Sequence, residues 1–265
     1  MKALWIFFFI TLISMNTHAQ DPQLPRQIYF FLGVGLPIMK IKDEGHSPLK
    51  YQGWIPTMRL GYEATSKNSV SRVAVSAALG VAKPQSIPNV QRNPSSTDVT
   101  NIQFSYVYYK RLGAYDTEGW NTYVGGALTF TFDIRNYALP SNNLVGYQTN
   151  ASLNMGAFAQ NKLSGQWRFN YEAFTPVISY TLRPNYLGML PMKGTDFNAK
   201  NVFSNGKIVT MNKLFRFYNR LSFDQQIKDY RQRRLFYSWD YHSNTVSKNL
   251  KSVSGGLGYE SLFKM

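Results

Sequence analysis

The chain lacks cysteine altogether, which excludes disulfide bonds and removes the thiol to which a bacterial lipoprotein's lipid is attached. Acidic residues are also few, 14 against 29 basic ones, so the formal net charge is +15. Beyond the first residues there is no apolar run approaching the roughly 20 residues that a transmembrane helix needs. A chain of this size without disulfides must be held together by hydrogen bonds and packing.

The only long hydrophobic run lies at the start of the chain, from Ala3 to Met15 after the basic Lys2. It is about 13 residues long, shorter than a helical membrane anchor requires. Thr17 and Ala19 place small residues three positions before, and immediately before, a potential cleavage site. We therefore predict a signal peptide over residues 1–19, followed by a single domain over residues 20–265.

The remaining chain is built from stretches in which apolar and polar side chains alternate. In the stretch 120–133, Trp120, Val124, Leu128 and Phe130 share one face, and polar or small residues occupy the other. Comparable stretches predict ten strands, which are Ile28–Ile38, Tyr51–Glu63, Ser69–Val81, Thr100–Leu112, Trp120–Arg135, Tyr147–Gln160, Gly165–Leu182, Lys213–Phe223, Arg231–Ser243 and Leu250–Phe263.

The connections between these strands are alternately long and short. Residues 64–68, 113–119 and 161–164 form short, turn-like connections, whereas the connection after the seventh strand runs from Arg183 to Asn212. Strands of 11 residues or more, such connections and an aromatic content of 15% favour an all-β, antiparallel transmembrane β-barrel over a soluble sandwich or barrel. Short turns then lie in the periplasm with both termini, and the strand number is even: about ten, with eight or twelve also possible.

Two local features refine this prediction. In the seventh strand, Trp167, Phe169 and Tyr171 follow one alternation and Phe174, Ile178 and Tyr180 the other. An extra residue near Ala173–Pro176 would produce that change as a β-bulge, where the missing N–H of proline is tolerated.

The last strand contains alternating apolar residues, Leu257, Tyr259 and Phe263, although Ser261 interrupts them and Lys264 and Met265 follow the final ring. This segment resembles the terminal assembly signal of Gram-negative outer-membrane β-barrels. The resemblance covers the leader and nearly all of the rest of the chain. It implies location in an outer membrane and carries no specific activity.

If the apolar faces point to lipid, the opposite faces carry most of the charged side chains into the lumen. A barrel of about ten strands is too narrow for the open channel of 16–18-stranded porins, so we expect these groups to pair with one another. A narrow, arginine-lined solute pore is the alternative. The predicted lumen set is Arg59, Glu63, Arg72, Arg111, Asp133, Arg135, Arg168, Glu172, Arg216, Arg220, Asp224, Arg234, Asp240, His242 and Glu260.

Asp240 and His242 are the candidate catalytic residues. They are two apart near the end of a strand, so both face the same side, where a carboxylate could orient an imidazole as a general base. The pair resembles the Asp-x-His of omptins, ten-stranded surface proteases that activate water between this pair and an Asp-x-Asp across the barrel. No Asp-x-Asp is present here; Asp116 and Glu118 lie in a predicted periplasmic turn.

A second resemblance overlaps the first. His242-Ser243-Asn244, with Glu260 downstream, is similar to the Ser, His and Glu of lipid A 3-O-deacylase barrels. Ser243 directly follows His242, so on a strand the two side chains point to opposite faces. A surface hydrolase, acting as protease or on lipid A, is therefore an alternative function that depends on Asp240 and His242.

The sequence offers no metal-binding spacing and no cofactor motif. The longest predicted outer loop is basic, with Arg183, Lys193, Lys200 and Lys207 against one acid. For an exported barrel, such charge favours the phosphates of lipopolysaccharide over nucleic acid as a partner, and another outer-membrane protein is a further candidate. We thus predict a structural, assembly or binding component of the outer membrane.

Overall fold

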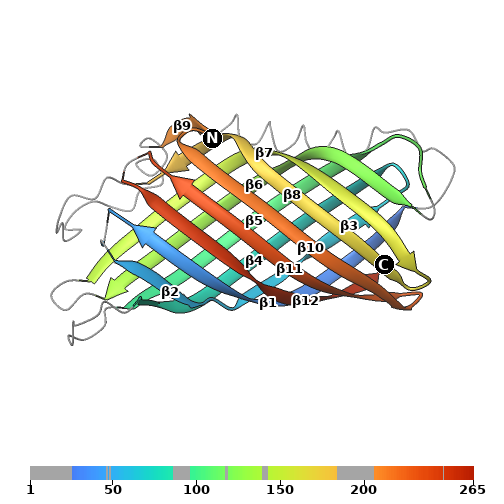
Figure 1. Cartoon of the computed structure of the whole chain (residues 1–265), viewed down its shortest axis with the longest axis horizontal. Helices are drawn as coiled ribbons and strands as arrows, with labels where there is room; N and C mark the ends of the chain where they lie inside the picture. The colour runs from blue at the N-terminus through green and yellow to red at the C-terminus, as the bar shows by residue number, and fades with distance from the viewer. Residues whose placement is uncertain are drawn as a thin grey trace.

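A closed ring of antiparallel strands makes up the computed structural model of the chain (Figure 1). The structure describes residues 26–45, 47, 49–85, 96–116, 119–138, 143–183, 206–246 and 248–265. Its strands are β1 (Gln27–Asp43), β2 (Lys50–Trp54), β3 (Thr57–Thr65), β4 (Ser69–Pro84), β5 (Ser96–Leu112), β6 (Trp120–Ala138), β7 (Asn143–Ser164), β8 (Trp167–Leu182), β9 (Lys207–Thr210), β10 (Leu214–Lys228), β11 (Arg231–Asn244) and β12 (Leu250–Lys264). In this part of the chain no helix is long and apolar enough to cross a membrane. The all-β, antiparallel prediction is confirmed.

The twelve strands occupy ten places around the ring. β2 and β3 both pair with β1 on one side and β4 on the other, so they form one strand interrupted at Ile55 and Pro56. β9 and β10 both pair with β8, separated by a turn over residues 211–213. The ring closes between the first and last strands, which pair from Tyr29 with Lys264 to Asp43 with Leu250.

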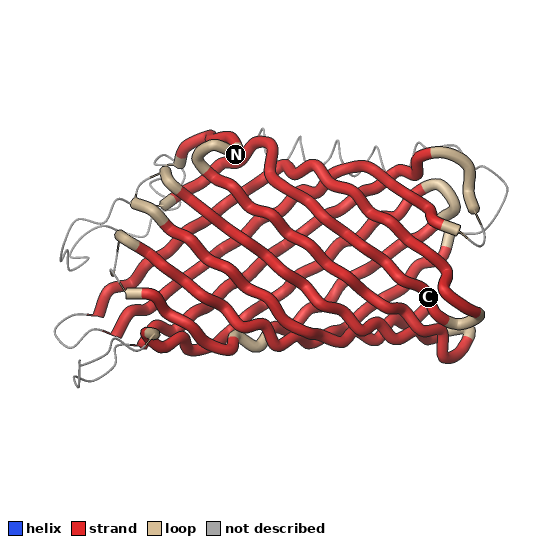
Figure 2. The backbone as a smooth tube through the Cα atoms, viewed as in Figure 1, coloured by secondary structure: helices blue, strands red, loops and turns tan. Residues whose placement is uncertain are grey.

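The two ends of the barrel differ in their connections, and we call them the turn end and the loop end (Figure 2). At the turn end, short connections follow β3, β5, β7 and β10, and the first strand begins beside the end of the last. Gly113, in one of these turns, has a φ of 74°, which glycine adopts without steric cost. At the loop end lie the connections that follow β1, β4, β6, β8 and β11. The predicted segregation of short and long connections is therefore present.

The alternation of the sequence appears as two different faces of the wall. The outer face is apolar, with exposed fractions of 45% for Val124 and 44% for Phe130. Their neighbours on the same strand, Tyr123, Ala127 and Thr129, point inward and are buried. A wall that is apolar outside and pairs every strand within the ring suits a lipid environment, where unpaired backbone groups are costly.

The irregularity expected in the seventh strand is present in β8. Leu153 of β7 pairs with Ile178, and Asn154 pairs with Pro176, so Val177 is the extra residue. Val177 and Ile178 are both exposed, while Pro176 and Ser179 are both buried. The bulge lies one residue beyond the predicted segment.

Several predicted boundaries need correction. β1 extends five residues past Ile38, because Ile41 and Asp43 continue the inward alternation. The predicted turn at residues 161–164 is part of β7, and the actual turn is at Gly165 and Gln166. The predicted loop 183–212 contains β9, which extends the ladder of β8. The predicted signal peptide lies outside the described residues.

Candidate functional site

Eight charged side chains form one connected cluster across the lumen. Four arginines meet four carboxylates, so the cluster is electrically neutral, and the eight residues come from six strands. All but Arg59 are buried. We call this the inner ion-pair cluster; it consists of Arg59, Glu63, Arg72, Glu172, Arg220, Asp224, Arg234 and Glu260.

Arg234 and Arg72 are the central members of the inner ion-pair cluster. Arg234 contacts Asp224 at 2.7 Å, Glu63 at 2.9 Å and Glu260 at 3.4 Å. Arg72 links Glu63 on β3, at 2.9 Å, to Glu172 on β8, at 2.8 Å. β3 and β8 are not neighbours in the ring, so these contacts cross the lumen. Forked guanidinium contacts of this kind fix the positions of carboxylates as well as neutralising them.

Apolar side chains fill the lumen on the turn-end side of this cluster. One group consists of Tyr29, Phe31, Ala74 and Leu262, and a second of Val70, Val107, Tyr109, Tyr123, Ala127 and Phe158. The Tyr109 hydroxyl connects the second apolar group to the inner ion-pair cluster by donating to Glu172 at 3.2 Å. Packed apolar groups beside a neutral cluster leave this half of the interior filled.

A second set of ion pairs lies toward the loop end. Asp43 accepts from Arg135 at 3.3 Å and also contacts Arg183, and Arg135 contacts Asp133. Arg216 binds both oxygens of Asp240, with its Nη2 2.6 Å from Oδ2. Three arginines thus balance three aspartates. We call this the rim ion-pair cluster; it consists of Asp43, Asp133, Arg135, Arg183, Arg216 and Asp240.

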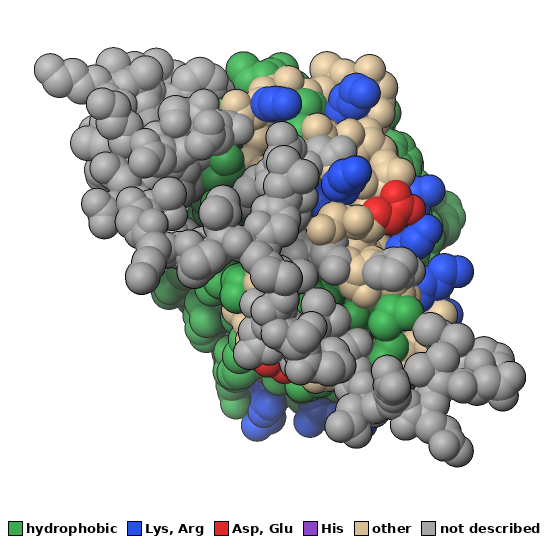
Figure 3. Space-filling model, turned by 90° about the vertical axis from the view of Figure 1, so that its left-hand side faces the viewer, with side chains coloured by type: hydrophobic (Ala, Val, Ile, Leu, Met, Phe, Trp, Pro, Cys, Tyr) green, Lys and Arg blue, Asp and Glu red, His purple; other side chains and the backbone are tan. Residues whose placement is uncertain are grey.

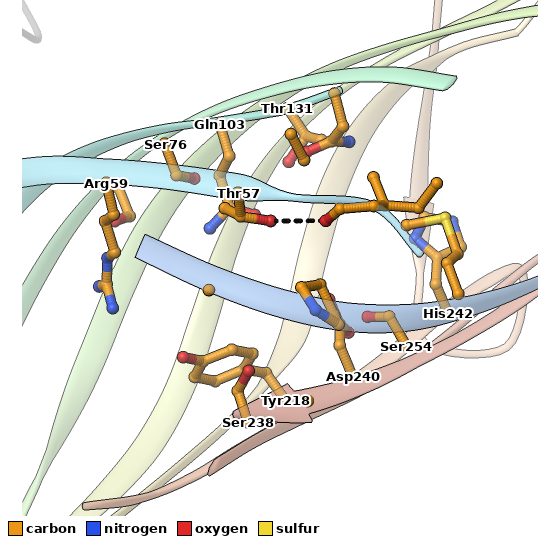
Figure 4. A pocket seen from close by; sticks show the side chains of 18 of the residues that line it. Thr57, Arg59, Ser76, Gln103, Thr131, Tyr218, Ser238, Asp240, His242 and Ser254 are labelled. Carbon is orange, nitrogen blue, oxygen red and sulfur yellow. Dashed lines mark hydrogen bonds between the residues drawn. The ribbon is translucent and has the colours of Figure 1, made fainter. Parts of the chain in front are cut away.

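A cavity of about 180 Å³ separates the two clusters, and we call it the chamber (Figure 4). Arg59, Arg72 and Glu172 line it on one side, and Asp133, Arg216, Asp240 and His242 on the other. Between them it is lined by hydroxyl and amide side chains, which are Thr57, Ser76, Asn101, Gln103, Ser105, Thr131, Asn150, Ser238, Ser252 and Ser254.

Small residues on two adjacent strands make room for an aromatic ring that lines the chamber. Gly35 of β1 is paired with Gly258 of β12. A Cβ atom at Gly258 would lie 2.1 Å from Cζ of Phe236, so the ring of Phe236 occupies the space that a side chain would take. The guanidinium of Arg220 lies over the same ring, 4.2 Å from its centre.

Asp240 and His242 both face the chamber, as their spacing requires. Asp240 is engaged by the guanidinium of Arg216, whereas the amide of Gln148 lies 3.3 Å from Nε2 of the His242 imidazole. Ser243 follows on the opposite face of β11. The assignment of Asp240 and His242 as catalytic residues stays a prediction, and both carboxylate oxygens of Asp240 accept hydrogen bonds from Arg216.

Two arginines of the predicted lumen set take part in neither ion-pair cluster. Arg111 is at the turn end, where it donates to the Gly113 carbonyl oxygen and to Asn68, so it does not join the pairs in the lumen. Arg168 lies opposite Asp224 on the neighbouring strand and forms no ion pair within the described part of the chain.

The predicted basic loop is also divided by the structure. Arg183 is buried and bonds to Asp43 and to the carbonyl oxygen of Lys248 at 2.5 Å, so it belongs to the interior and not to a surface loop. Lys207 begins β9 and is exposed. Lys193 and Lys200 lie outside the described residues.

Arg183 was predicted in the basic outer loop, and Asp43 is the one member of the rim ion-pair cluster that no predicted set of site residues contains. It was placed in a loop because the first strand was ended too early. Asp43 lies an even number of residues after Tyr29, Phe31 and Ile41, so it shares their inward face, and all four side chains are buried. This period of two is the signal that could have identified it.

Lysines gather on the outer face of the loop end. Lys42 of β1 is directly paired with Lys251 of β12 and with Lys50 of β2, and we call these three the lysine row. Glu44 provides one nearby carboxylate: hydrogen bonds from Lys42 and Asn249 lower its pKa and keep it ionised. Figure 3 shows that basic side chains outnumber acidic ones along the visible part of this rim.

The structure is similar to outer-membrane β-barrels of known structure. The outer-membrane protease OmpT from Escherichia coli aligns with a TM-score of 0.60 over 95% of this chain and all of that one, at 7% sequence identity. Neisserial surface protein A aligns with a TM-score of 0.36 over 87% of this chain and 95% of that one, at 11% identity. No family model and no curated protein sequence matches the chain.

At such low identity the likeness to OmpT shows the fold alone. The chain is therefore an outer-membrane type of β-barrel, as its terminal strand and alternating connections predicted. Nothing about activity follows from this comparison.

Proposed function

We propose that this protein is a non-conducting barrel of the outer membrane that acts as a structural or binding component of the cell surface. The observation that carries the proposal is the inner ion-pair cluster. Its side chains join opposite walls of the lumen, and Glu260, at its centre, is wholly inaccessible to solvent. A lumen filled in this way has no path for a hydrated solute, which argues against the narrow-pore alternative.

Lipopolysaccharide is the partner that we propose for the outer surface. The lysine row places like charges directly opposite one another on three adjacent strands, an arrangement that is unfavourable without more counter-charge than the single carboxylate of Glu44, which pairs with Lys42. Phosphates of lipid headgroups would supply that charge at the border of the apolar wall. With this partner the loop end faces the cell exterior and both termini face the periplasm.

The hydrolase alternative has less support from the geometry. A general base needs its orienting carboxylate within hydrogen-bond reach, but both oxygens of Asp240 bind Arg216.

Conductance in planar bilayers tests the proposed function. We expect purified protein that migrates differently before and after boiling, and is therefore folded, to insert without producing conductance steps. The filled half of the lumen is the physical reason. Reproducible ohmic steps from the folded protein would overturn the proposal in favour of a pore.

A further inference from the structure

The chamber is a cavity that a purely structural barrel would not need. Its walls hold inward-facing side chains that are only half-buried, including Ser76, Ser238 and Ser254, although they lie inside the ring. Figure 4 shows side chains from several strands pointing into this shared space. Half-burial inside the ring means that water-sized molecules fit against these groups.

We propose that the chamber binds one small, neutral, polyhydroxylated molecule about the size of a single sugar ring. This inference concerns the lumen and does not depend on the proposed binding of lipid at the outer surface.

The balance of charge around the chamber disfavours ionic ligands. The ion pairs on both sides of the chamber are internally balanced, four against four in the inner ion-pair cluster and three against three in the rim ion-pair cluster. An anion or cation in the chamber would lose its hydration without gaining an unpaired counter-charge. A neutral molecule does not pay this desolvation cost.

The chamber offers both donors and acceptors. Its hydroxyls can do either, and Asn101 and Gln103 add amide groups. Two buried polar atoms of lining residues have no hydrogen-bond partner: Oδ1 of Asp133, an acceptor, and Nε of Arg135, a donor. A ligand with several hydroxyls can satisfy groups of both kinds, whereas an apolar ligand would leave them unpaired.

Size and shape set the upper limit. A volume of about 180 Å³ holds several water molecules and lies below the roughly 300–1,000 Å³ of pockets for drug-sized ligands. The rings of Phe174, Tyr218 and Phe236 also line the chamber and provide apolar surface for the C–H groups of a sugar.

Calorimetric titration of the folded full-length protein with D-glucose tests the proposal. The detergent should have a zwitterionic headgroup, since glycoside detergents would compete. We expect saturable binding of glucose, and binding at least tenfold weaker for glucuronate and glucosamine, which share the ring but carry charge. Absence of saturable glucose binding, or tighter binding of either charged sugar, overturns the proposal.

A pair of variants on one strand localises the binding. Ser238→Leu fills the chamber, and Ser243→Leu places the same side chain on the outer face of β11. We expect the first to abolish glucose binding and the second to retain it. Ser254→Leu on β12 replaces the first variant if that one does not fold. Equal glucose affinity in a folded chamber variant and in the wild type would show that the sugar binds elsewhere and would overturn the assignment.

Discussion

At the scale of single residues, the interior of this barrel is held together by arginines that each bind several carboxylates. Arg234 is the clearest case, because it contacts Asp224, Glu63 and Glu260 and is itself buried. A buried charge that loses its partner cannot recover its hydration. Removal of one of these contacts therefore destabilises the fold mainly because it leaves an unpaired buried charge, and less because the attraction itself is lost.

We predict that Arg234→Ala lowers the free energy of unfolding by about 3 to 5 kcal/mol, because Asp224, Glu63 and Glu260 all lose a partner. The neighbouring Arg233 is exposed on the outer face and provides the matched control. Arg233→Ala should change stability by no more than about 0.5 kcal/mol. Urea titration of both variants in lipid vesicles measures the difference; equal stabilities would show that the cluster does not stabilise the fold.

Alternation along the strands was sufficient to predict which residues face inward. It was insufficient to predict their partners, because pairing across the lumen depends on how distant strands face each other. Arg72 and Glu172 are 100 residues apart, and nothing in their local sequence links them. The single predicted charge network is in fact two, separated by the chamber, and Asp43 was missed through an error in one strand boundary.

At the scale of elements, β8 shows how a strand accommodates one extra residue. Val177 is inserted between two residues that pair with consecutive positions of β7. Its apolar side chain lies on the outer face, where lipid can surround it, and the strand resumes with Ser179 inward. Sequence alternation revealed this bulge because it changed phase, but the short β9 escaped prediction because four residues are too few to show a period.

Deletion of Val177 should therefore yield a barrel that still folds, with stability changed by less than about 2 kcal/mol. Without it, Pro176 and Ile178 alternate regularly, and every other side chain keeps its face. Deletion of Phe130 from the regular strand β6 is the control, since it would turn Asp133 and Arg135 toward lipid. Migration before and after boiling reports folding. If both deletion variants fail to fold, the bulge is required and not merely tolerated.

At the scale of the whole molecule, charge is distributed unevenly between interior and surface. The two ion-pair clusters are neutral, so the net charge of +15 lies outside them. Part of it forms the lysine row, on the outer face of the loop end. A molecule with neutral ion-pair clusters inside and a basic rim is suited to holding anionic headgroups around its circumference.

We predict that replacing Lys42, Lys50 and Lys251 together by glutamine weakens binding to lipopolysaccharide vesicles. Each lysine near an anionic surface contributes about 1 kcal/mol, so the loss should be on the order of 100-fold. The control carries glutamine at Lys162, Lys228 and Lys264, which are exposed at the turn end. Co-sedimentation with vesicles at low and high salt measures both affinities. Equal losses in the two triple variants would rule out a specific role for the lysine row.

The pairing of the first strand with the last has a consequence for how the chain reaches its native state. β1 must find a partner that lies at the other end of the sequence, so the contact that closes the ring has the longest loop to close. Until β12 arrives, β1 and β11 each expose a free edge that could pair with another chain. Synthesis that stops short of β12 would therefore leave an open sheet prone to aggregation. Pairing of β12 with both β1 and β11 covers the two free edges.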